Sequence, residues 1–259
     1  MAIEDYLEKY TAHCKKKKMT PLAGLVKKLT EAIDTGDLIE EFVLKGNIPE
    51  LKMNRINDDA VDPIVHPLSS LGFLKVLDLS FNELGDKGAT NIAKYIKNDS
   101  VLEVLILKSN KIGSNGIISI SKALHYNSQI CYLDLSNNTI GDEGGMAVAN
   151  MMQVNASITN LFISGCKLPA TSLIAIATVL QANNYIQQLD MSNNMLSTGT
   201  LSQTLQNDVM THISTSIAMN YGIKVLNLSK SGISDYIMCH LLAPAMKANR
   251  NIETLDLSW

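Results

Sequence analysis

The 259-residue sequence has few aromatic residues and little net charge, and each shortage excludes a class of function. Aromatic residues make up 5% of the chain, which leaves few surfaces on which the bases of single-stranded nucleic acid could stack. The formal net charge of −3 gives no overall attraction to nucleic acid or to an anionic membrane. No apolar run approaches the roughly 18 residues that suggest a membrane-spanning helix. We therefore expect neither a nucleic-acid partner nor a membrane partner.

The four cysteines are far apart in the sequence and show no paired metal-ligand spacing such as C-x-x-C. The first ten residues, MAIEDYLEKY, are polar and acidic, unlike a secretory signal. The chain is 46% hydrophobic and 18% charged, which is typical of a folded soluble protein. These features predict a cytoplasmic protein with reduced thiols and no metal site.

One apolar template, L-x-x-L-x-L-x-x-N-x-L, recurs along most of the chain. Its clearest copy contains Leu74, Leu77, Leu79, Asn82 and Leu84. The Asn position of the template is filled in successive copies by Asn82, Asn110, Asn138, Cys166, Asn194 and Ser231. The first five of these positions are 28 residues apart, and a weaker copy 28 residues before Asn82 contains Asn54. A period held over so many copies is the signature of a repeat protein.

A second apolar rhythm follows each template copy. Ile92, Ala93 and Ile96 have the spacing of one helical face, and equivalent residues recur in the next copies. Each unit therefore predicts a short strand, a turn at the Asn position, and a helix that packs back on the strand. Neither element can bury its apolar side alone, so neighbouring units must stack into a continuous core.

The template and its period resemble the leucine-rich repeat family, specifically its ribonuclease-inhibitor-like class. The resemblance covers about residues 38–259. It implies an α/β fold: a right-handed solenoid, or horseshoe, with a parallel sheet on the concave side and helices on the convex side.

The run Gly85-Asp86-Lys87-Gly88 looks like a phosphate-binding loop, because it is glycine-rich and carries a lysine before a predicted helix. The equivalent runs, Gly113-Ser114-Asn115-Gly116 and Gly141-Asp142-Glu143-Gly144, keep the glycines but not the lysine. We therefore interpret the glycines as residues that shape the turn between strand and helix.

The residues at the Asn position of the template are interpreted as structural. The side-chain amide of asparagine can both donate to and accept from the backbone where the chain leaves the strand. Cys166 is a weaker hydrogen-bonding substitute for asparagine, with a redox or metal role as the alternative.

Residues 1–37 are predicted to form a helical cap over the first edge of the solenoid. Thr20 and Pro21 indicate a helix start, and the apolar residues that follow have helical spacing. An earlier amphipathic helix would use Ile3, Tyr6, Leu7 and Tyr10 for its apolar face. The four lysines at 15–18 are interpreted as a solvated turn, with nuclear targeting or an acidic partner as alternatives.

Residues 38–259 are predicted to form about seven units, with two departures from the period. The interval from Asn194 to Ser231 is nine residues longer than the others, and we place the extra residues in a loop within 197–208. The sequence ends in IETLDLSW, within a further copy that contains Trp259. This predicts an incomplete final repeat, in a fragment or shortened isoform, with its edge covered by further repeats or by another chain.

No catalytic residue is predicted, and no cofactor. The five histidines fall in different parts of the chain, and none is spaced to pair with a nucleophile or a metal-ligand set. Patterns such as H-E-x-x-H and G-x-S-x-G are absent from the sequence.

The concave face of the sheet is the predicted binding surface. Because side chains alternate along a strand, the residues between the buried leucines point to this face. A middle column of acidic residues interrupted by isoleucine and phenylalanine would suit a basic partner with apolar anchors. The alternative is that these acidic residues only belong to the common consensus sequence of such repeats. The predicted contact residues are Val76, Asp78, Ser80, Ile106, Lys108, Tyr132, Asp134, Phe162, Gln188, Asp190 and Asn227.

The leading hypothesis is a non-enzymatic scaffold that binds protein partners through the concave face and the strand-to-helix loops. A second hypothesis is a regulator of a small GTPase, because the Ran GTPase-activating protein is built from similar repeats. Against it, the chain has only two arginines, Arg55 and Arg250, for an arginine-finger mechanism, and it lacks an acidic tail. A third hypothesis is a structural role in a cytoskeletal or ciliary assembly, so the nucleus and the cilium are alternatives to the cytoplasm.

Overall fold

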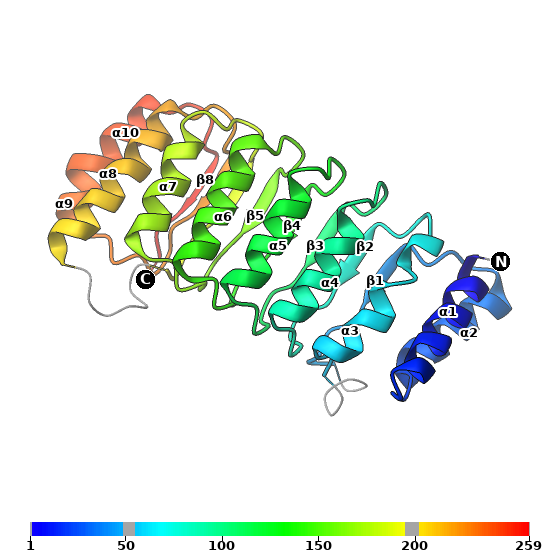
Figure 1. The fold of residues 1–259 in the computed structure, drawn as a ribbon. Coiled ribbons are helices and arrows are strands. Elements are labelled where there is room, and N and C mark those ends of the chain that lie inside the picture. The colour runs from blue at the N-terminus through cyan, green and yellow to red at the C-terminus, as the bar shows by residue number, and fades with distance from the viewer. Residues whose placement is uncertain (1, 49–54, 195–201, 259) are drawn as a thin grey trace.

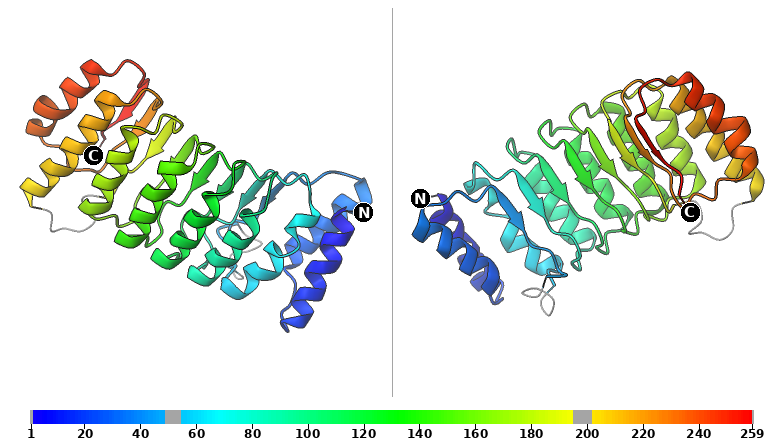
Figure 2. Two further views of the ribbon diagram at one scale, coloured as in Figure 1. Left: turned by 45° about the horizontal axis from the view of Figure 1, so that its top comes forward. Right: turned by 180° about the vertical axis from the view of Figure 1, so that it is seen from behind.

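A computed structural model describes residues 2–48, 55–194 and 202–258 as a curved stack of alternating strands and helices (Figure 1). The strands of the described residues form one parallel sheet in chain order, from β1 to β8. Their bounds are β1 Glu41–Val43, β2 Val76–Asp78, β3 Val104–Ile106, β4 Tyr132–Asp134, β5 Asn160–Phe162, β6 Gln188–Asp190, β7 Val225–Asn227 and β8 Thr254–Asp256. Seen from two further sides, the sheet lines one side of the stack and the helices lie on the other (Figure 2). This confirms the predicted α/β solenoid with a parallel sheet.

From α3 onward, the helices connect one strand to the next and pack against their neighbours in order. Their bounds are α1 Ala2–Lys16, α2 Ala23–Thr35, α3 Asp58–Val65, α4 Asp86–Ile96, α5 Ser114–Leu124, α6 Gly141–Val154, α7 Ala170–Leu180, α8 Gln203–Met219, α9 Asp235–Ile237 and α10 Ala243–Ala248. A 3₁₀ helix, η1, spans Leu68–Ser70, and a π-helix, η2, spans Met238–Leu242. The parallel crossover between strands requires such a connection, since a tight turn joins only antiparallel strands.

The core is continuous along the stack. Leu77 in β2 and Leu133 in β4 are completely buried, as is Ile92 on the inner face of α4. In each unit the strand leucines meet the apolar face of the following helix, so both elements bury their apolar sides together. This arrangement makes the stability of one unit depend on its neighbours.

The strand register follows the sequence period. Leu77 pairs with Leu105 and Leu105 with Leu133, each 28 positions apart. Leu189 pairs with Leu226 across the longer interval, so the extra residues leave the register of the sheet intact. They lengthen a helix instead of forming only a loop. Residues 197–201 lie outside the described residues, but α8 begins at Gln203, and Ser202 Oγ caps it by accepting the backbone N–H of Leu205 at 3.3 Å.

The position of the first strand differs from the one that the 28-residue period predicts. Phe42 of β1 pairs with Leu77 of β2, 35 positions later, so the strand precedes the place that a 28-residue interval assigns to it. The template in this unit begins with Ile39, Phe42 and Leu44, all buried. The 28-residue match holds only after the strand, where Ile56 donates its backbone N–H to the side chain of Asn82. The predicted turn residue Asn54 lies outside the described residues.

Helices α1 and α2 lie at the β1 end of the stack (Figure 1). Tyr6 is completely buried, donates its hydroxyl to the carbonyl oxygen of Ile64 at 2.9 Å, and meets the ring of Phe42 edge-on at 5.3 Å. The start of α2 differs from the prediction, because the helix begins at Ala23, two positions after Pro21. The backbone N–H of Leu22 is satisfied by the hydroxyl of Tyr10 at 2.8 Å, in place of the predicted threonine cap.

At the other end, β8 pairs with β7 through Leu255 and Leu226. Leu226 and Leu228 are buried, whereas Leu255 and Leu257 are only partly buried. Trp259 lies outside the described residues.

Candidate protein-binding face

The strand register aligns the predicted contact residues into columns on the concave face. Asp78 lies beside Ile106, Ile106 beside Asp134, and so on along the sheet. The full middle column is Val43, Asp78, Ile106, Asp134, Phe162, Asp190, Asn227 and Asp256. A neighbouring column contains Val76, Val104, Tyr132, Asn160, Gln188 and Val225, and the strand ends continue into Ser80, Lys108, Ser136, Ser164 and Ser192.

The carboxylates of the middle column accept hydrogen bonds from backbone N–H groups at the ends of their own strands. Asp78 accepts the backbone N–H of Ser80 at 2.9 Å, and Asp134 accepts that of Ser136 at the same distance. The same contact is made by Asp190 with Ser192, Asn227 with Ser229 and Asp256 with Ser258. These side chains therefore satisfy a backbone group where the chain leaves the sheet, which accounts for the recurrence of aspartate and serine in the template.

Two of these aspartates are less accessible than their position on the sheet suggests. Asp78 is 3% exposed and pairs with the ammonium of Lys45 at 3.3 Å. Asp134 is 8% exposed between its column neighbours Ile106 and Phe162, and this burial raises its pKa above the usual value, although Ser136 and Lys108 oppose the rise. Asp190 is only partly buried. Among these three aspartates, Asp190 is therefore the most open to a partner.

An aromatic pair occupies the middle of the sheet. The rings of Tyr132 and Phe162 have centroids 4.9 Å apart and are tilted by 35°. Both side chains remain partly exposed, and partial burial raises the pKa of the Tyr132 hydroxyl. Beside them, the amide of Asn160 donates to Gln188 at 2.9 Å, and the hydroxyls of Ser164 and Ser192 are 2.8 Å apart. The centre of the concave face thus offers an apolar contact area with polar groups around it.

The asparagines at the strand exit form a ladder between units. The amide of Asn110 donates to the carbonyl oxygens of Leu79 and Leu107, while its oxygen accepts the N–H of Leu84. Asn82, Asn138 and Asn194 make the corresponding contacts in their own units. Each side chain thereby satisfies buried backbone groups of two units, as a donor and as an acceptor.

Cys166 and Ser231 stand in two of these positions and change the local backbone. Cys166 is completely buried, and its thiol lies 3.3 Å from the carbonyl oxygen of Leu135. The residue after each of them, Lys167 and Gly232, has a left-handed φ of 56° and 64°. The carbonyl of Cys166 accepts the N–H of Gly141, and that of Ser231 accepts the amide of Gln206. At Cys166 a backbone carbonyl thus accepts an N–H group, as the asparagine side-chain oxygen does in other units, whereas the Ser231 carbonyl accepts a side-chain amide.

A second asparagine ladder, which the sequence reasoning missed, lies at the turn from helix to strand. Asn155 donates its amide to the carbonyl oxygens of Leu124 and Asn127 and accepts the N–H of Ile158. Asn127, Asn183, Asn220 and Asn249 make the same kind of contact with their preceding units. The signal was present in the sequence, because an asparagine or aspartate recurs at this position in every copy from Asp99 onward.

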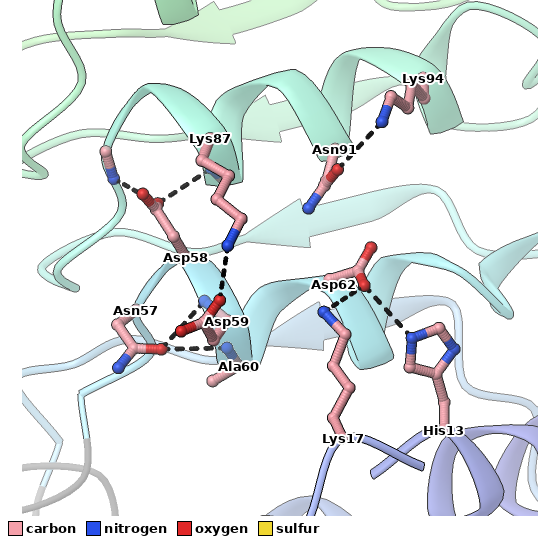
Figure 3. Close-up of polar contacts among 12 residues, drawn as sticks. His13, Lys17, Asn57, Asp58, Asp59, Ala60, Asp62, Lys87, Asn91 and Lys94 are labelled. Carbon is pink, nitrogen blue, oxygen red and sulfur yellow. Dashed lines mark hydrogen bonds and ion pairs between the residues drawn. The ribbon is translucent and has the colours of Figure 1, made fainter. Parts of the chain in front are cut away.

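The run that resembles a phosphate loop already binds an anion from its own chain. One carboxylate oxygen of Asp58 accepts the backbone N–H groups of Gly85 at 2.6 Å and Gly88 at 2.9 Å (Figure 3). Asp86 does the same for Gly113 and Gly116 in the next unit. Glycine is required because a Cβ on Gly88 would lie 2.5 Å from the Asp58 oxygen. Lys87 points to Asp59 at 2.8 Å, so the loop serves packing between units and not phosphate binding.

The structure brings together two histidines that are far apart in the sequence. The rings of His13 in α1 and His66 after α3 have centroids 4.9 Å apart. Asp62 of α3 contacts His13 at 3.2 Å and Lys17 at 2.5 Å (Figure 3). Partial burial opposes ionisation of Asp62, but Lys17 and His13 outweigh it and hold its pKa below the usual value. Lys17 is therefore an ion-pairing residue, and the four-lysine run is divided between the end of α1 and the turn after it.

Within the described ranges, no group of three or more His, Cys, Asp or Glu side chains is arranged to hold a metal ion. None of the helices in the same ranges combines the length and apolar character needed to cross a bilayer.

A stack of parallel strands in register, joined through helices and bound by side-chain amide ladders, defines a repeat solenoid. The chain contains leucine-rich repeats: a leucine-rich repeat family model matches residues 73–93, 98–121 and 128–149. Among solved structures, the chain is similar to the C-terminal domain of tropomodulin from Caenorhabditis elegans, with 17% identity, a TM-score of 0.48, and coverage of 63% of this chain and 92% of that one. It is also similar to actin-binding site 2 of leiomodin-1, with 22% identity, a TM-score of 0.49, and coverage of 59% and 86%. No curated protein sequence matches the chain.

Proposed function

We propose that this protein is a non-enzymatic scaffold that binds a protein partner on the concave face of its sheet. The observation that carries the proposal is the partly exposed aromatic pair of Tyr132 and Phe162, with Asp190 next to Phe162 in the adjacent strand. A partner with an apolar anchor beside a basic side chain fits this arrangement. The likeness to tropomodulin and leiomodin concerns the fold alone, so the partner is inferred from the face itself.

The hydrogen-bonded backbone beneath this face is suited to binding a partner protein. Ladder asparagines fix the ends of β3 and β4 and the start of β5, so the contact residues of these strands are held on a rigid surface and lose little conformational entropy when a partner binds. Aromatic side chains at the centre of such a surface are the residue type most often found to dominate binding energy. The carboxylates contribute mainly to orientation and to the rate of association.

The test is affinity purification of partners on the wild-type chain, followed by direct binding measurements with each purified partner. Phe162→Ala should weaken binding at least about tenfold, because it removes half of the aromatic pair. Asp190→Lys should weaken binding and reverse its salt dependence, since it replaces an attraction with a repulsion. The matched controls are Tyr236→Ala and Glu143→Lys, which make comparable changes at exposed positions on α9 and α6. Equal affinity for the wild type and all four variants would remove the concave face as the binding site.

The GTPase-regulator hypothesis finds no support in the comparisons with known proteins. Arg55 lies before α3 in the first unit and Arg250 lies after α10 near β8, so the two arginines do not share a site. A GTP-hydrolysis assay with a panel of small GTPases separates the hypotheses, because a scaffold leaves the hydrolysis rates unchanged. We place the scaffold in the cytoplasm, with a cytoskeletal or ciliary assembly as the alternative setting, and imaging of the tagged full-length protein tests this placement.

A further inference from the structure

A row of exposed apolar side chains lies outside the concave face, along the edge where each helix turns into the next strand. Its members are Tyr126, Val154, Tyr185, Met219 and Tyr221, which we call the tyrosine rim. They are 74%, 58%, 57%, 50% and 75% exposed. Isolated exposed apolar residues are ordinary, but a contiguous row of them is typical of an interaction site.

The second asparagine ladder places the turns that carry these residues side by side. Tyr126 and Val154 directly precede Asn127 and Asn155, and Asn155 donates to the carbonyl oxygen of Asn127. Further along, Met219 and Tyr221 flank Asn220, which donates to the carbonyl oxygen of Asn183. Tyr185 lies two positions after Asn183 and donates its backbone N–H to the side chain of that asparagine at 3.0 Å. The turns from helix to strand therefore stack side by side over four consecutive units along one edge of the solenoid (Figure 1).

The same ladder makes the rim rigid. Each turn is closed by an asparagine oxygen that accepts two backbone N–H groups, such as those of Ser157 and Ile158 for Asn155. Tyr221 is also fixed by its own N–H, which donates to the side chain of Asn184 at 2.8 Å. Because the rim is already ordered, it loses little backbone entropy when a partner docks, which favours binding.

The charge of the rim differs from that of the concave face. The four turn segments, residues 122–131, 150–159, 178–187 and 215–224, contain Lys122, His125 and Lys224 but no aspartate or glutamate. The ammonium of Lys97, from the preceding turn at residues 94–103, lies 5.1 Å from the centroid of the Tyr126 ring. That turn also carries Lys94, Asp99 and Glu103, and Asp99 already accepts the N–H groups of Val101 and Leu102. An incoming carboxylate therefore meets cationic groups here, whereas it would meet aspartates on the concave sheet.

We propose that the tyrosine rim is a second binding surface, which takes a partner-protein segment whose apolar side chains are flanked by carboxylates. Strands about 4.8 Å apart and helices about 9 Å apart make the row roughly 15 to 30 Å long over four units. An extended segment of about ten residues spans that length at about 3.3 Å per residue. A lipid surface fits less well, because polybasic membrane sites carry about four to eight lysines or arginines, and these turn segments contain two lysines.

The experiment selects binders from a displayed library of random peptides of about ten residues. The folded wild-type protein is the target, and the selected peptides are synthesised for fluorescence anisotropy. We expect enriched sequences that combine aspartate or glutamate with aromatic or aliphatic residues. The double variant Tyr126→Ser/Tyr221→Ser should raise the Kd of such a peptide at least about tenfold, because it removes the two most exposed rings of the rim. Added salt should weaken the wild-type complex.

Matched variants separate this surface from the rest of the molecule. Tyr236→Ser removes a 55% exposed tyrosine on α9 and should leave the peptide Kd unchanged. Asp190→Lys should also leave the peptide Kd unchanged, so this experiment tests the rim independently of the concave-face proposal. The inference is overturned if no peptide is enriched, if the enriched peptides are basic, or if their affinity survives the double variant. It is also overturned if the double variant instead abolishes sedimentation with vesicles of phosphatidylcholine and phosphatidylserine, which would make the rim a membrane contact.

Discussion

The side-chain amide nitrogen of Asn155 lies 2.7 Å from the carbonyl oxygen of Leu124, the last residue of α5 in the preceding unit. The same amide reaches the carbonyl of Asn127 at 3.1 Å, and its oxygen accepts the N–H groups of Ser157 and Ile158 at 2.9 Å each. Asn155 is 7% exposed, so water cannot readily replace these contacts. A single side chain thus joins two helix ends and the start of a strand.

Asn155→Ala should therefore be strongly destabilising. It leaves two carbonyls and two N–H groups without their partner in a buried turn, and we expect a loss of about 2 to 4 kcal/mol in the free energy of unfolding. Urea denaturation followed by circular dichroism measures this loss. Asn150→Ala, at an exposed position on α6, is the matched control and should change stability by less than about 0.5 kcal/mol. Similar losses in the two variants would mean that the ladder contributes little.

Much of the fold was predictable because the residues that determine it recur at a fixed interval in the sequence. Leu77, Leu105 and Leu133 recur at one interval and pair in one register, so a single template fixes the sheet order. The first strand escaped prediction because Phe42 replaces leucine and the interval to Leu77 is 35 residues. The start of α8 escaped it because Ser202, a polar residue in the longer interval, serves as a helix cap. Local capping and insertion length are not periodic, so the template carries no information about either.

The order of the residue columns on the sheet was predictable, but the accessibility of their side chains was not. Alternation along a strand correctly orders the concave columns, but it does not show that Asp134 lies between Ile106 and Phe162 in neighbouring strands. The burial of its carboxylate depends on those neighbours, which are far away in sequence. The contact between His13 and His66 has the same origin, since it joins α1 to the end of α3.

Gly116→Ala tests the packing of one helix start on the preceding unit. A Cβ at this position would lie 2.7 Å from Ile112 Cγ2, 2.8 Å from an Asp86 oxygen and 2.9 Å from Ala89 Cβ. We expect a loss of about 1 to 3 kcal/mol, because the neighbours are packed side chains that cannot all move away. Gly72→Ala is the control, since its Cβ would meet nothing within 4 Å, and it should be nearly neutral. A neutral Gly116→Ala in urea denaturation would show that the two units can separate without cost.

The cysteines should differ sharply in reactivity. Burial raises the pKa of the Cys166 thiol to about 12, so almost none of it is thiolate at pH 8. Cys239 is exposed and open to reagents. We expect iodoacetamide at pH 8 to label Cys239 quickly and Cys166 only at the rate at which its unit opens, as followed by peptide mass spectrometry. Rapid labelling of Cys166 in the folded protein would contradict its burial, and denatured protein, in which both thiols react, is the control.

Acid should loosen the contact between α1 and α3. Lys17 and His13 hold the pKa of Asp62 below its unfolded value, so the unfolded chain takes up this proton first as the pH falls. The stability from this carboxylate is fully present above about pH 4 and is lost as the pH falls through its folded pKa. Asp62→Asn should lower the thermal midpoint at pH 7 and reduce its drop between about pH 5 and pH 3. Asp34→Asn, at an exposed position on α2, is the control; an identical pH profile for the two variants would exclude this ion pair as an acid-sensitive contact.

The carboxylate of Asp134 presents the opposite case. Burial raises its pKa above the value of 3.8 that it would have in the unfolded chain, so the folded protein binds this proton more tightly. The stabilising effect of protonation is therefore present below about pH 4 and is lost as the pH rises through the folded pKa.

Asp134→Asn keeps an oxygen that can accept the N–H of Ser136 but removes the buried charge, so we expect unchanged or slightly higher stability at pH 7.5. Asp134→Lys places an ammonium in the buried site and removes the acceptor, which should cost several kcal/mol. Urea midpoints at pH 4 and pH 7.5 measure both effects, with Asp208→Asn, an exposed position on α8, as the control. If Asp134→Asn proves as damaging as Asp134→Lys, the concave face depends on the negative charge itself and not on the hydrogen bond to Ser136.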